Sequence, residues 1–81
     1  LPVDRLKIDR AFVRDIATPA DDGAIVRAII DMAHDLNLWV TAEGVETQAQ
    51  LGFLQAHACD ETQGFFFGAP TPPEEFVRFL S

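Results

Sequence analysis

The chain has 81 residues, of which 48% are hydrophobic and 23% are charged, and its formal net charge is −7. An apolar content this high excludes an intrinsically disordered segment, and the short length allows one small domain at most. The excess of acidic residues opposes binding to a nucleic-acid backbone, so a small anionic ligand would need metal ions beside it.

A short strand is predicted first, over residues 6–9, and Pro19 then breaks the chain. Asp21 or Asp22 has the type of side chain that caps the amino end of a helix. Asn37 tolerates the left-handed backbone conformation that commonly ends one. The helical spacing between them predicts a core-facing set of apolar residues: Ile25, Ile29, Met32, Ala33 and Leu36.

The second predicted strand covers residues 38–42, which are nearly all apolar or β-branched. Such a run fits a strand that is buried on both faces, as in a parallel sheet. Residues 43–46 interrupt the run. Thr47 and Gln50 have the spacing of a capping box that opens a second helix, which is predicted to turn Leu51, Leu54 and Ala58 inward.

A third strand is predicted over residues 62–67, followed by a loop at Gly68 and Pro70. Residues 71–74 have the pattern of a second capping box, and the helix that they open would face the core with Phe76, Val77 and Leu80. The order βαβαβα with short connections is typical of an α/β fold with parallel strands. Three such strands leave exposed edges, so we expect other segments of a longer chain, or copies of this one, to cover them.

Three polar residues lie toward the carboxyl ends of three different predicted strands: Lys7, Glu43 and Gln63. Barrels of the α/β type assemble catalytic groups at those ends. Each residue also has a structural interpretation, since Lys7 could pair with Asp9 and Gln63 could satisfy neighbouring backbone groups. Glu43 directly follows an apolar strand, which is a poor place for a solvated surface charge. Glu46 could favour a helix amino end or contact a ligand or partner.

Cys59 is the only cysteine, so an internal disulfide is impossible and a reduced, cytoplasmic setting is expected. No apolar run reaches the roughly 20 residues that span a bilayer, which predicts no membrane contact from this segment. The chain opens without methionine, so we expect it to come from a longer protein, whose N-terminal regions could hold sensory domains or a membrane tether.

Three motifs together resemble the last three strand motifs of EAL phosphodiesterase domains: residues 6–10 (LKIDR), 42–47 (AEGVET) and 63–65 (QGF). The segments 25–34 and 72–76 are similar to that family as well. The resemblance implies that residues 1–81 are the C-terminal third of an EAL domain, contributing the last three strand-helix units of a modified (β/α)8 TIM-like barrel. It further implies hydrolysis of cyclic di-GMP to linear pGpG with Mg²⁺ or Mn²⁺.

By the same resemblance, Lys7 would hold the attacking water or a phosphate oxygen, Glu43 would ligate one metal, and Gln63 would support a metal-coordinated water. Two cations that activate water and neutralise phosphoryl charge would explain these residue types. Glu46 and Pro70 would border the guanine site or a dimer contact. The implied partners are cyclic di-GMP and the remainder of the EAL barrel.

The Glu-Ala-Leu motif of the family, its metal-ligating asparagine and glutamate, and the paired aspartates of its Asp-Asp-Phe-Gly segment are missing from this chain. We therefore expect these 81 residues alone to be inactive, whereas the parent protein would be a phosphodiesterase. Two alternatives stay open. One is a degenerate EAL domain that binds cyclic di-GMP without cleaving it, and the other is an inactive fragment that self-associates through its sheet edges.

Overall fold

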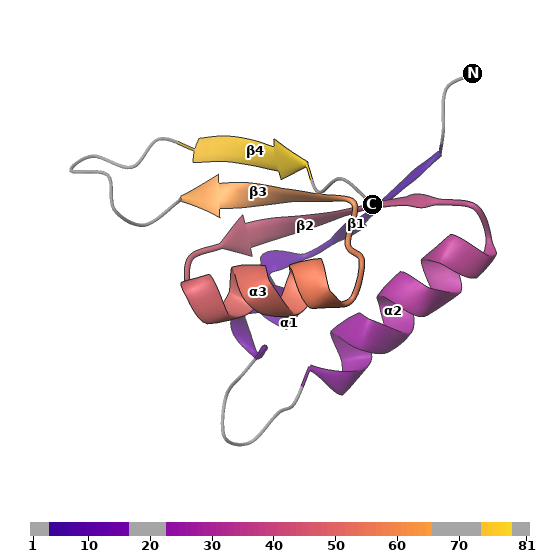
Figure 1. Ribbon diagram of the computed structural model, residues 1–81, viewed down its shortest axis with the longest axis horizontal. Coiled ribbons are helices and arrows are strands. Elements are labelled where there is room, and N and C mark those ends of the chain that lie inside the picture. Colours follow the sequence, from indigo (N-terminus) through magenta and orange to yellow (C-terminus); the bar gives the residue numbers. More distant parts are fainter. Residues whose placement is uncertain (1–3, 17–22, 66–73, 79–81) are drawn as a thin grey trace.

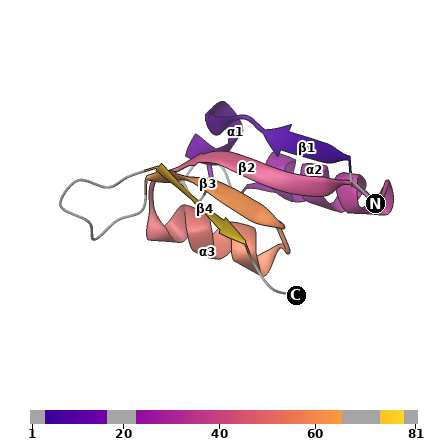
Figure 2. The same cartoon turned by 90° about the horizontal axis from the view of Figure 1, so that it is seen from above.

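In the computed structural model, residues 4–16, 23–65 and 74–78 are described, and within them the strands form one sheet. Its strands are β1 (Arg5–Ile8), β2 (Trp39–Val45), β3 (Glu61–Phe65) and β4 (Glu74–Arg78), and they lie side by side in that order (Figures 1 and 2). The β1–β2 and β2–β3 pairs are parallel. The predicted parallel strands are confirmed.

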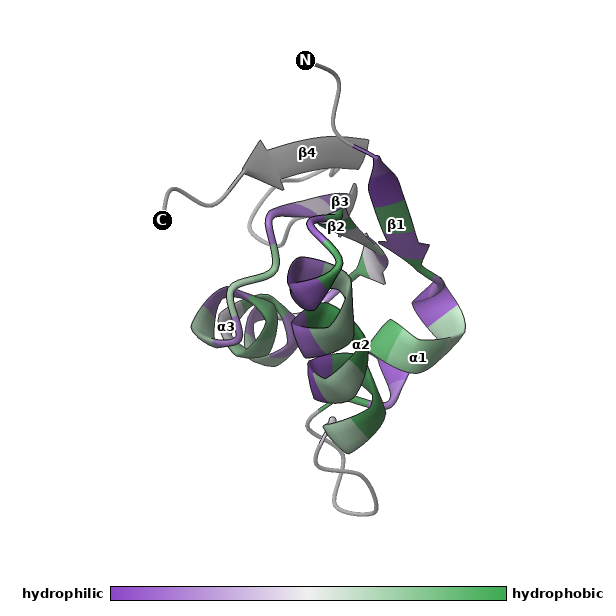
Figure 3. Cartoon of the chain, turned by 90° about the vertical axis from the view of Figure 1, so that its right-hand side faces the viewer, coloured by the Kyte–Doolittle hydropathy of each residue, from purple (hydrophilic) through white to green (hydrophobic). Residues whose placement is uncertain are grey.

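The helices all lie on one side of the sheet (Figures 1 and 3). Helix α1 (Arg10–Arg14) directly follows β1, α2 (Ala24–Asp35) precedes β2, and α3 (Gln48–Ala56) connects β2 to β3. Parallel neighbours need such crossover connections, because each strand must start again at the same end of the sheet. The sequence did not predict α1, a single short helix that sits close to β2.

The two faces of the sheet differ in chemistry because successive strand residues point to opposite sides. Strand β1 alternates between hydrophilic and hydrophobic residues along its length (Figure 3). The side that faces the helices carries the core, with Ile8, Val40 and Ala42 at most 2% exposed. The other side carries the charged residues of these three strands together with Thr41 and Gln63, whereas Thr62 of β3 is buried on the core side, in register with Ala42. It is therefore the open side on which functional groups can gather.

Side-chain caps open α1 and α3, whereas the N-cap of α2 is Gly23, which makes no side-chain cap. Asp9 ends the first strand and caps α1, because its Oδ1 accepts a hydrogen bond from the backbone N–H of Ala11 at 2.8 Å. The predicted capping box at the start of α3 is confirmed by reciprocal bonds between Thr47 and Gln50. Asn37 adopts a φ of 61°, as its predicted role at a helix end requires.

The predicted inward face of α2 is confirmed at Ala33, which is buried, and at Ile29, which packs against the core, but it is wrong at its other three positions. Ile25, Met32 and Leu36 are 55%, 51% and 63% exposed, and the buried residues of the helix are Val26, Ile30 and Ala33. Apolar residues occupy adjacent positions in this helix, so helical spacing alone fits two faces. Ala58, also predicted to point inward, is exposed and lies just beyond α3 with a φ of 65°.

The third predicted helix is wrong where the structure describes it, because residues 74–78 form β4, antiparallel to β3. The outer edge of β3 presents unpaired backbone N–H and C=O groups, and a strand supplies their partners where a helix cannot. The predicted capping box lies mostly in residues 71–73, and Leu80 follows β4; these residues are outside the described part of the chain.

Candidate active site

The three residues predicted from strand ends lie together on the polar face of the sheet. The Nζ atom of Lys7 on β1 is 3.8 Å from Oε1 of Glu43 on β2, and Glu43 is the direct register partner of Gln63 on β3. We call Lys7, Glu43 and Gln63 the candidate catalytic row. The structure thus brings side chains that are far apart in the sequence onto adjacent strands.

The Lys7–Glu43 contact is open to solvent, since the two side chains are 67% and 36% exposed. Exposed ion pairs contribute only about 0–1 kcal/mol to stability, so this pair does little to hold the fold together. An ammonium beside a half-buried carboxylate remains available to a ligand. Such a pair suits an anionic substrate on the lysine and a cation on the carboxylate.

The residues fit one part of a metal site. Glu43 offers carboxylate oxygens and its neighbour Gln63 an amide, both suited to a hard divalent cation and its coordinated waters. Within residues 4–16, 23–65 and 74–78, no group of three or more His, Cys, Asp or Glu side chains could hold a metal ion by itself.

A bulge in β2 sets the direction of Glu43. The register with β3 shifts between Glu43 and Val45, so that Gly44 is an extra residue, with a φ of 74°. Glycine adopts this conformation at no steric cost. A Cβ at Gly44 would also lie 2.5 Å from Cβ of Arg10 on α1. Bulges next to active sites commonly redirect a side chain, and this one keeps Val45 in the core while Glu43 faces away.

Gly64 on β3 accommodates the same bulge from the other side. A Cβ at this position would collide with the carbonyl oxygen of Val45 and lie 2.7 Å from its backbone nitrogen. The backbone of β2 therefore approaches Gly64 more closely than any other residue type allows. The glycines that follow Glu43 and Gln63 have a structural role, because together they allow the close approach of the two strands that carry these side chains.

The two remaining predicted site residues are less constrained by the structure. Glu46 is exposed just beyond β2, and its backbone N–H donates a hydrogen bond to Oε1 of Gln50 at 2.7 Å. Gln50 is buried and also belongs to the capping box, so the start of α3 fixes the backbone at Glu46. Pro70 lies outside the described residues.

Sequence reasoning missed a second polar row on the same face, formed by Arg5, Thr41 and Glu61. Glu61 is only 4% exposed, and its Oε1 accepts hydrogen bonds from Nη1 of Arg5 at 3.3 Å and from Oγ1 of Thr41 at 3.2 Å. We call these residues the anchoring row. The sequence did contain a signal for this row: each member precedes a residue of the candidate catalytic row by two positions, and strand residues two apart point to the same face.

A separate polar cluster joins α2 to the starts of β2 and β3. Nε2 of His34 lies 2.7 Å from Oδ2 of Asp60, which also accepts the backbone N–H of Val40 at 2.8 Å. The His34–Asp60 contact is half-buried, with the two side chains 34% and 28% exposed. No helix within the described residues is both long and apolar enough to cross a bilayer.

Comparisons with known proteins agree with the geometry. The family model for the EAL domain matches residues 1–70. The chain is 51% identical over 79 residues to signaling protein YkoW of Bacillus subtilis and 48% identical over 81 residues to the bifunctional diguanylate cyclase/cyclic di-GMP phosphodiesterase MucR of Pseudomonas aeruginosa. These matches cover 98% and 100% of this chain but only 10% and 12% of the relatives.

Solved structures give the same result. The PaMucR phosphodiesterase in complex with c-di-GMP is 50% identical, with a TM-score of 0.72, and the match covers 89% of this chain and 29% of that one. The EAL domain of Mycobacterium smegmatis DcpA is 43% identical, with a TM-score of 0.71, over 89% of this chain and 32% of that one. The chain has the fold of part of a TIM-like barrel, and it belongs to the EAL domain family.

Proposed function

We propose that this chain forms the C-terminal part of the catalytic barrel of a protein that hydrolyses cyclic di-GMP to linear pGpG. The observation that carries the proposal is the candidate catalytic row, which comes from three adjacent parallel strands and lies on the face away from the helices. Barrels with this strand arrangement carry their catalytic groups on strand ends. The similarity to MucR and NbdA, both named as cyclic di-GMP phosphodiesterases of Pseudomonas aeruginosa, supports the choice of substrate.

In the proposed site each member of the row has one role. Lys7 donates hydrogen bonds to a phosphate oxygen or to the attacking water, and it offsets negative charge as the phosphoryl group reacts. Glu43 contributes carboxylate ligands to a divalent cation, Mg²⁺ or Mn²⁺, and Gln63 orients a water beside it. When bound, such cations lower the pKa of water and stabilise charge on the phosphoryl oxygens. The remaining ligands come from the rest of the EAL barrel.

The bulge in β2 supports these roles. Gly44 and Gly64 shape the backbone next to Glu43 and Gln63, so the backbone positions of these two residues are fixed relative to each other. Metal ligation and proton transfer tolerate displacements of only about 0.5 Å. Glu46, fixed through the backbone by Gln50, and Pro70 are proposed to border the guanine base.

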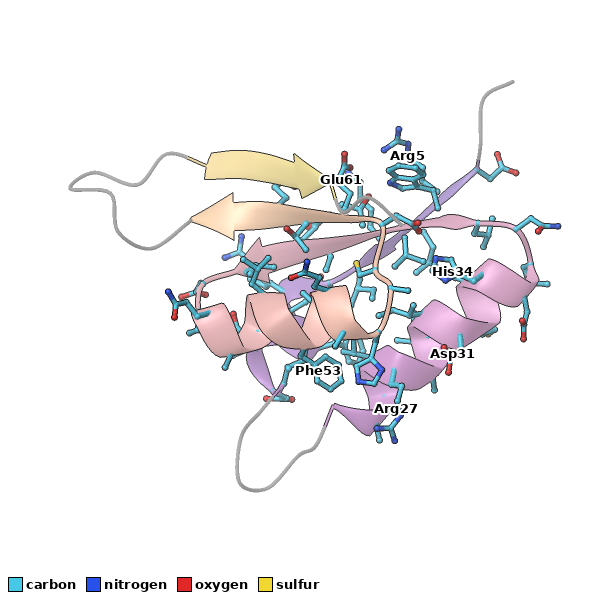
Figure 4. All side chains as sticks on the ribbon, viewed as in Figure 1. Arg5, Arg27, Asp31, His34, Phe53 and Glu61 are labelled. Carbon is cyan, nitrogen blue, oxygen red and sulfur yellow. The ribbon has the colours of Figure 1, made fainter. Side chains whose placement is uncertain are left out.

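The direct test is hydrolysis of cyclic di-GMP by the full-length protein that contains this chain, with Lys7→Ala or Glu43→Ala. We expect each substitution to lower kcat by roughly 10²–10⁴-fold, since each removes a group that stabilises the reacting phosphate or its metal. The matched controls are Arg27→Ala and Asp31→Ala, which remove an exposed cation and an exposed carboxylate from α2, on the other side of the sheet (Figure 4).

The controls should keep hydrolysis within about twofold of the wild-type rate, because surface substitutions away from a site change stability by only about 0.5 kcal/mol. An unchanged rate in the Lys7 or Glu43 variant would refute the assigned roles. A wild-type protein that binds cyclic di-GMP without hydrolysing it would instead be a receptor.

A further inference from the structure

The anchoring row lies directly beside the candidate catalytic row on the same face. Strand side chains repeat every two residues, so the residue two positions before any member points the same way. Arg5 stands in this relation to Lys7, Thr41 to Glu43, and Glu61 to Gln63. Figure 4 shows Arg5 and Glu61 together on the side of the sheet away from α2 and α3.

A single carboxylate oxygen connects the strands in this row. Oε1 of Glu61 on β3 accepts hydrogen bonds from Nη1 of Arg5 on β1 and from Oγ1 of Thr41 on β2, at 3.3 and 3.2 Å. The guanidinium of Arg5 also lies over the ring of Trp39, 5.3 Å from its centroid, within the range of a cation–π attraction. The Trp39 ring therefore supports the guanidinium of Arg5, which reaches across β2 to Glu61 on β3.

The burial of Glu61 makes the connection selective for one register. Its side chain is only 5% exposed, and a buried charge that loses its partners is strongly destabilising. A slip of one residue between these strands would also turn each polar side chain toward the core. The three strands are consequently held in the one register that keeps Arg5, Thr41 and Glu61 in contact. The same register sets the spacing of the candidate catalytic row.

We propose that Arg5, Thr41 and Glu61 are positioning residues, which act through β1, β2 and β3 to hold Lys7, Glu43 and Gln63 in the geometry for cation binding. This inference rests on the proposed function, because it concerns the same site. A positioning role differs from a purely structural role in one measurable respect. Loss of the anchoring row should weaken cation binding, whereas loss of an ordinary stabilising contact should only make the protein easier to unfold.

The experiment is a calorimetric titration of the full-length protein with Mn²⁺ alone, together with thermal unfolding. Glu61→Gln keeps the size of the side chain and removes its charge. We expect it to weaken Mn²⁺ binding by roughly 10–100-fold, the range for residues that orient metal ligands. Thr41→Val removes one donor at nearly constant volume, and it provides a second test if Glu61→Gln fails to fold. A smaller loss, about threefold to tenfold, is expected for it.

Asp60→Asn is the matched control, since Asp60 is also a carboxylate at the start of β3 that ties strands and a helix together. It should lower Tm and leave Mn²⁺ affinity within about twofold. A double variant with Arg5→Met and Glu61→Gln should bind Mn²⁺ no more weakly than Glu61→Gln alone, because both changes break the same contact.

The inference is overturned if the Glu61 and Thr41 variants lower Tm as Asp60→Asn does while binding Mn²⁺ like the wild type. A wild-type protein that binds Mn²⁺ but does not hydrolyse cyclic di-GMP would refute the proposed function instead. In that event the order of Mn²⁺ affinities among the variants still decides whether the anchoring row positions the site.

Discussion

Cys59 lies in the core just before β3, where it is 1% exposed. Its sulfur is within hydrogen-bonding distance of two backbone carbonyls, those of Val40 at 3.6 Å and Glu61 at 3.3 Å. Burial raises the pKa of the thiol from its ordinary value of 9.0 to about 11, because the apolar surroundings disfavour the thiolate. The thiol is thus a packing residue, and folding keeps it protonated.

This shift predicts a loss of stability at alkaline pH. The unfolded chain releases the Cys59 proton near pH 9 and the folded chain only near pH 11, so the contribution is fully present below pH 9 and disappears as pH rises to 11. Urea unfolding of the full-length protein and of Cys59→Ala should show it. From pH 9 to 11 the free energy of unfolding of the wild type should fall relative to that of the variant, by at most about 1.4 kcal/mol per pH unit. A difference that is constant from pH 8 to 11 would contradict the prediction.

The bulge in β2 depends on the absence of a side chain at Gly64. The backbone of Val45 occupies the space that a Cβ would need, and backbone atoms cannot rotate away as a flexible side chain can. Strain at this position would therefore spread along both strands. It would also reach Gln63 and Glu43, which lie next to the two residues that meet there.

Gly64→Ala should destabilise the full-length protein by about 2–4 kcal/mol, since overpacking against fixed backbone is among the costlier core changes. Gly52→Ala is the matched control, because a Cβ at Gly52 meets nothing within 4 Å. It lies inside α3, where alanine should stabilise by about 0.5–1 kcal/mol. Urea unfolding measures both, and equal stability of the two variants would be incompatible with the described bulge.

The sequence predicted elements where their causes are local. The capping box of Thr47 and Gln50 was predictable because both partners lie within one helical turn. Strand β4 was not, since its pairing depends on the edge of β3, which a capping pattern in residues 71–74 does not reveal. The face of α2 was misassigned because Ile25 and Val26 are both apolar, and only packing against the sheet decides which is buried.

The candidate site also has features that the local sequence predicts and features that depend on the strand order. Lys7, Glu43 and Gln63 could be found because each is a polar residue near the end of an apolar strand, and the EAL resemblance added their roles. The contact between Arg5 and Glu61 joins residues 56 positions apart, so it could be found only once the strand order was known. The bulge at Gly44 was also hidden, because it is a shift in the register between β2 and β3 and its close contacts are with Arg10 and Gly64.

The molecule as a whole has one covered face and one open face. Helices pack on the core side, while the opposite side presents the charged rows, and in the described residues β1 has a neighbouring strand only on the side of β2. A parallel sheet in a TIM-like barrel is covered on both faces. Since the chain spans 29% of the PaMucR structure, the rest of the EAL domain is the proposed cover for the polar face.

The isolated 81-residue chain should therefore bind cyclic di-GMP at most weakly in the presence of Mg²⁺, because it lacks the other wall of the site. Calorimetric titration would show little heat for the chain and clear saturation for the full-length protein. Light scattering on the same samples tests self-association through the β1 edge, which we expect to increase with concentration. Tight binding by the isolated chain would mean that these strands alone form a ligand site.

The outer edge of β3 can hold only one neighbour at a time, and in this structure β4 holds it along Glu61–Phe65. In a closed barrel that edge belongs to another strand of the ring. Reconstituting a barrel from this piece and its complement is consequently a strand-displacement reaction. Its rate depends on how readily β4 separates from β3.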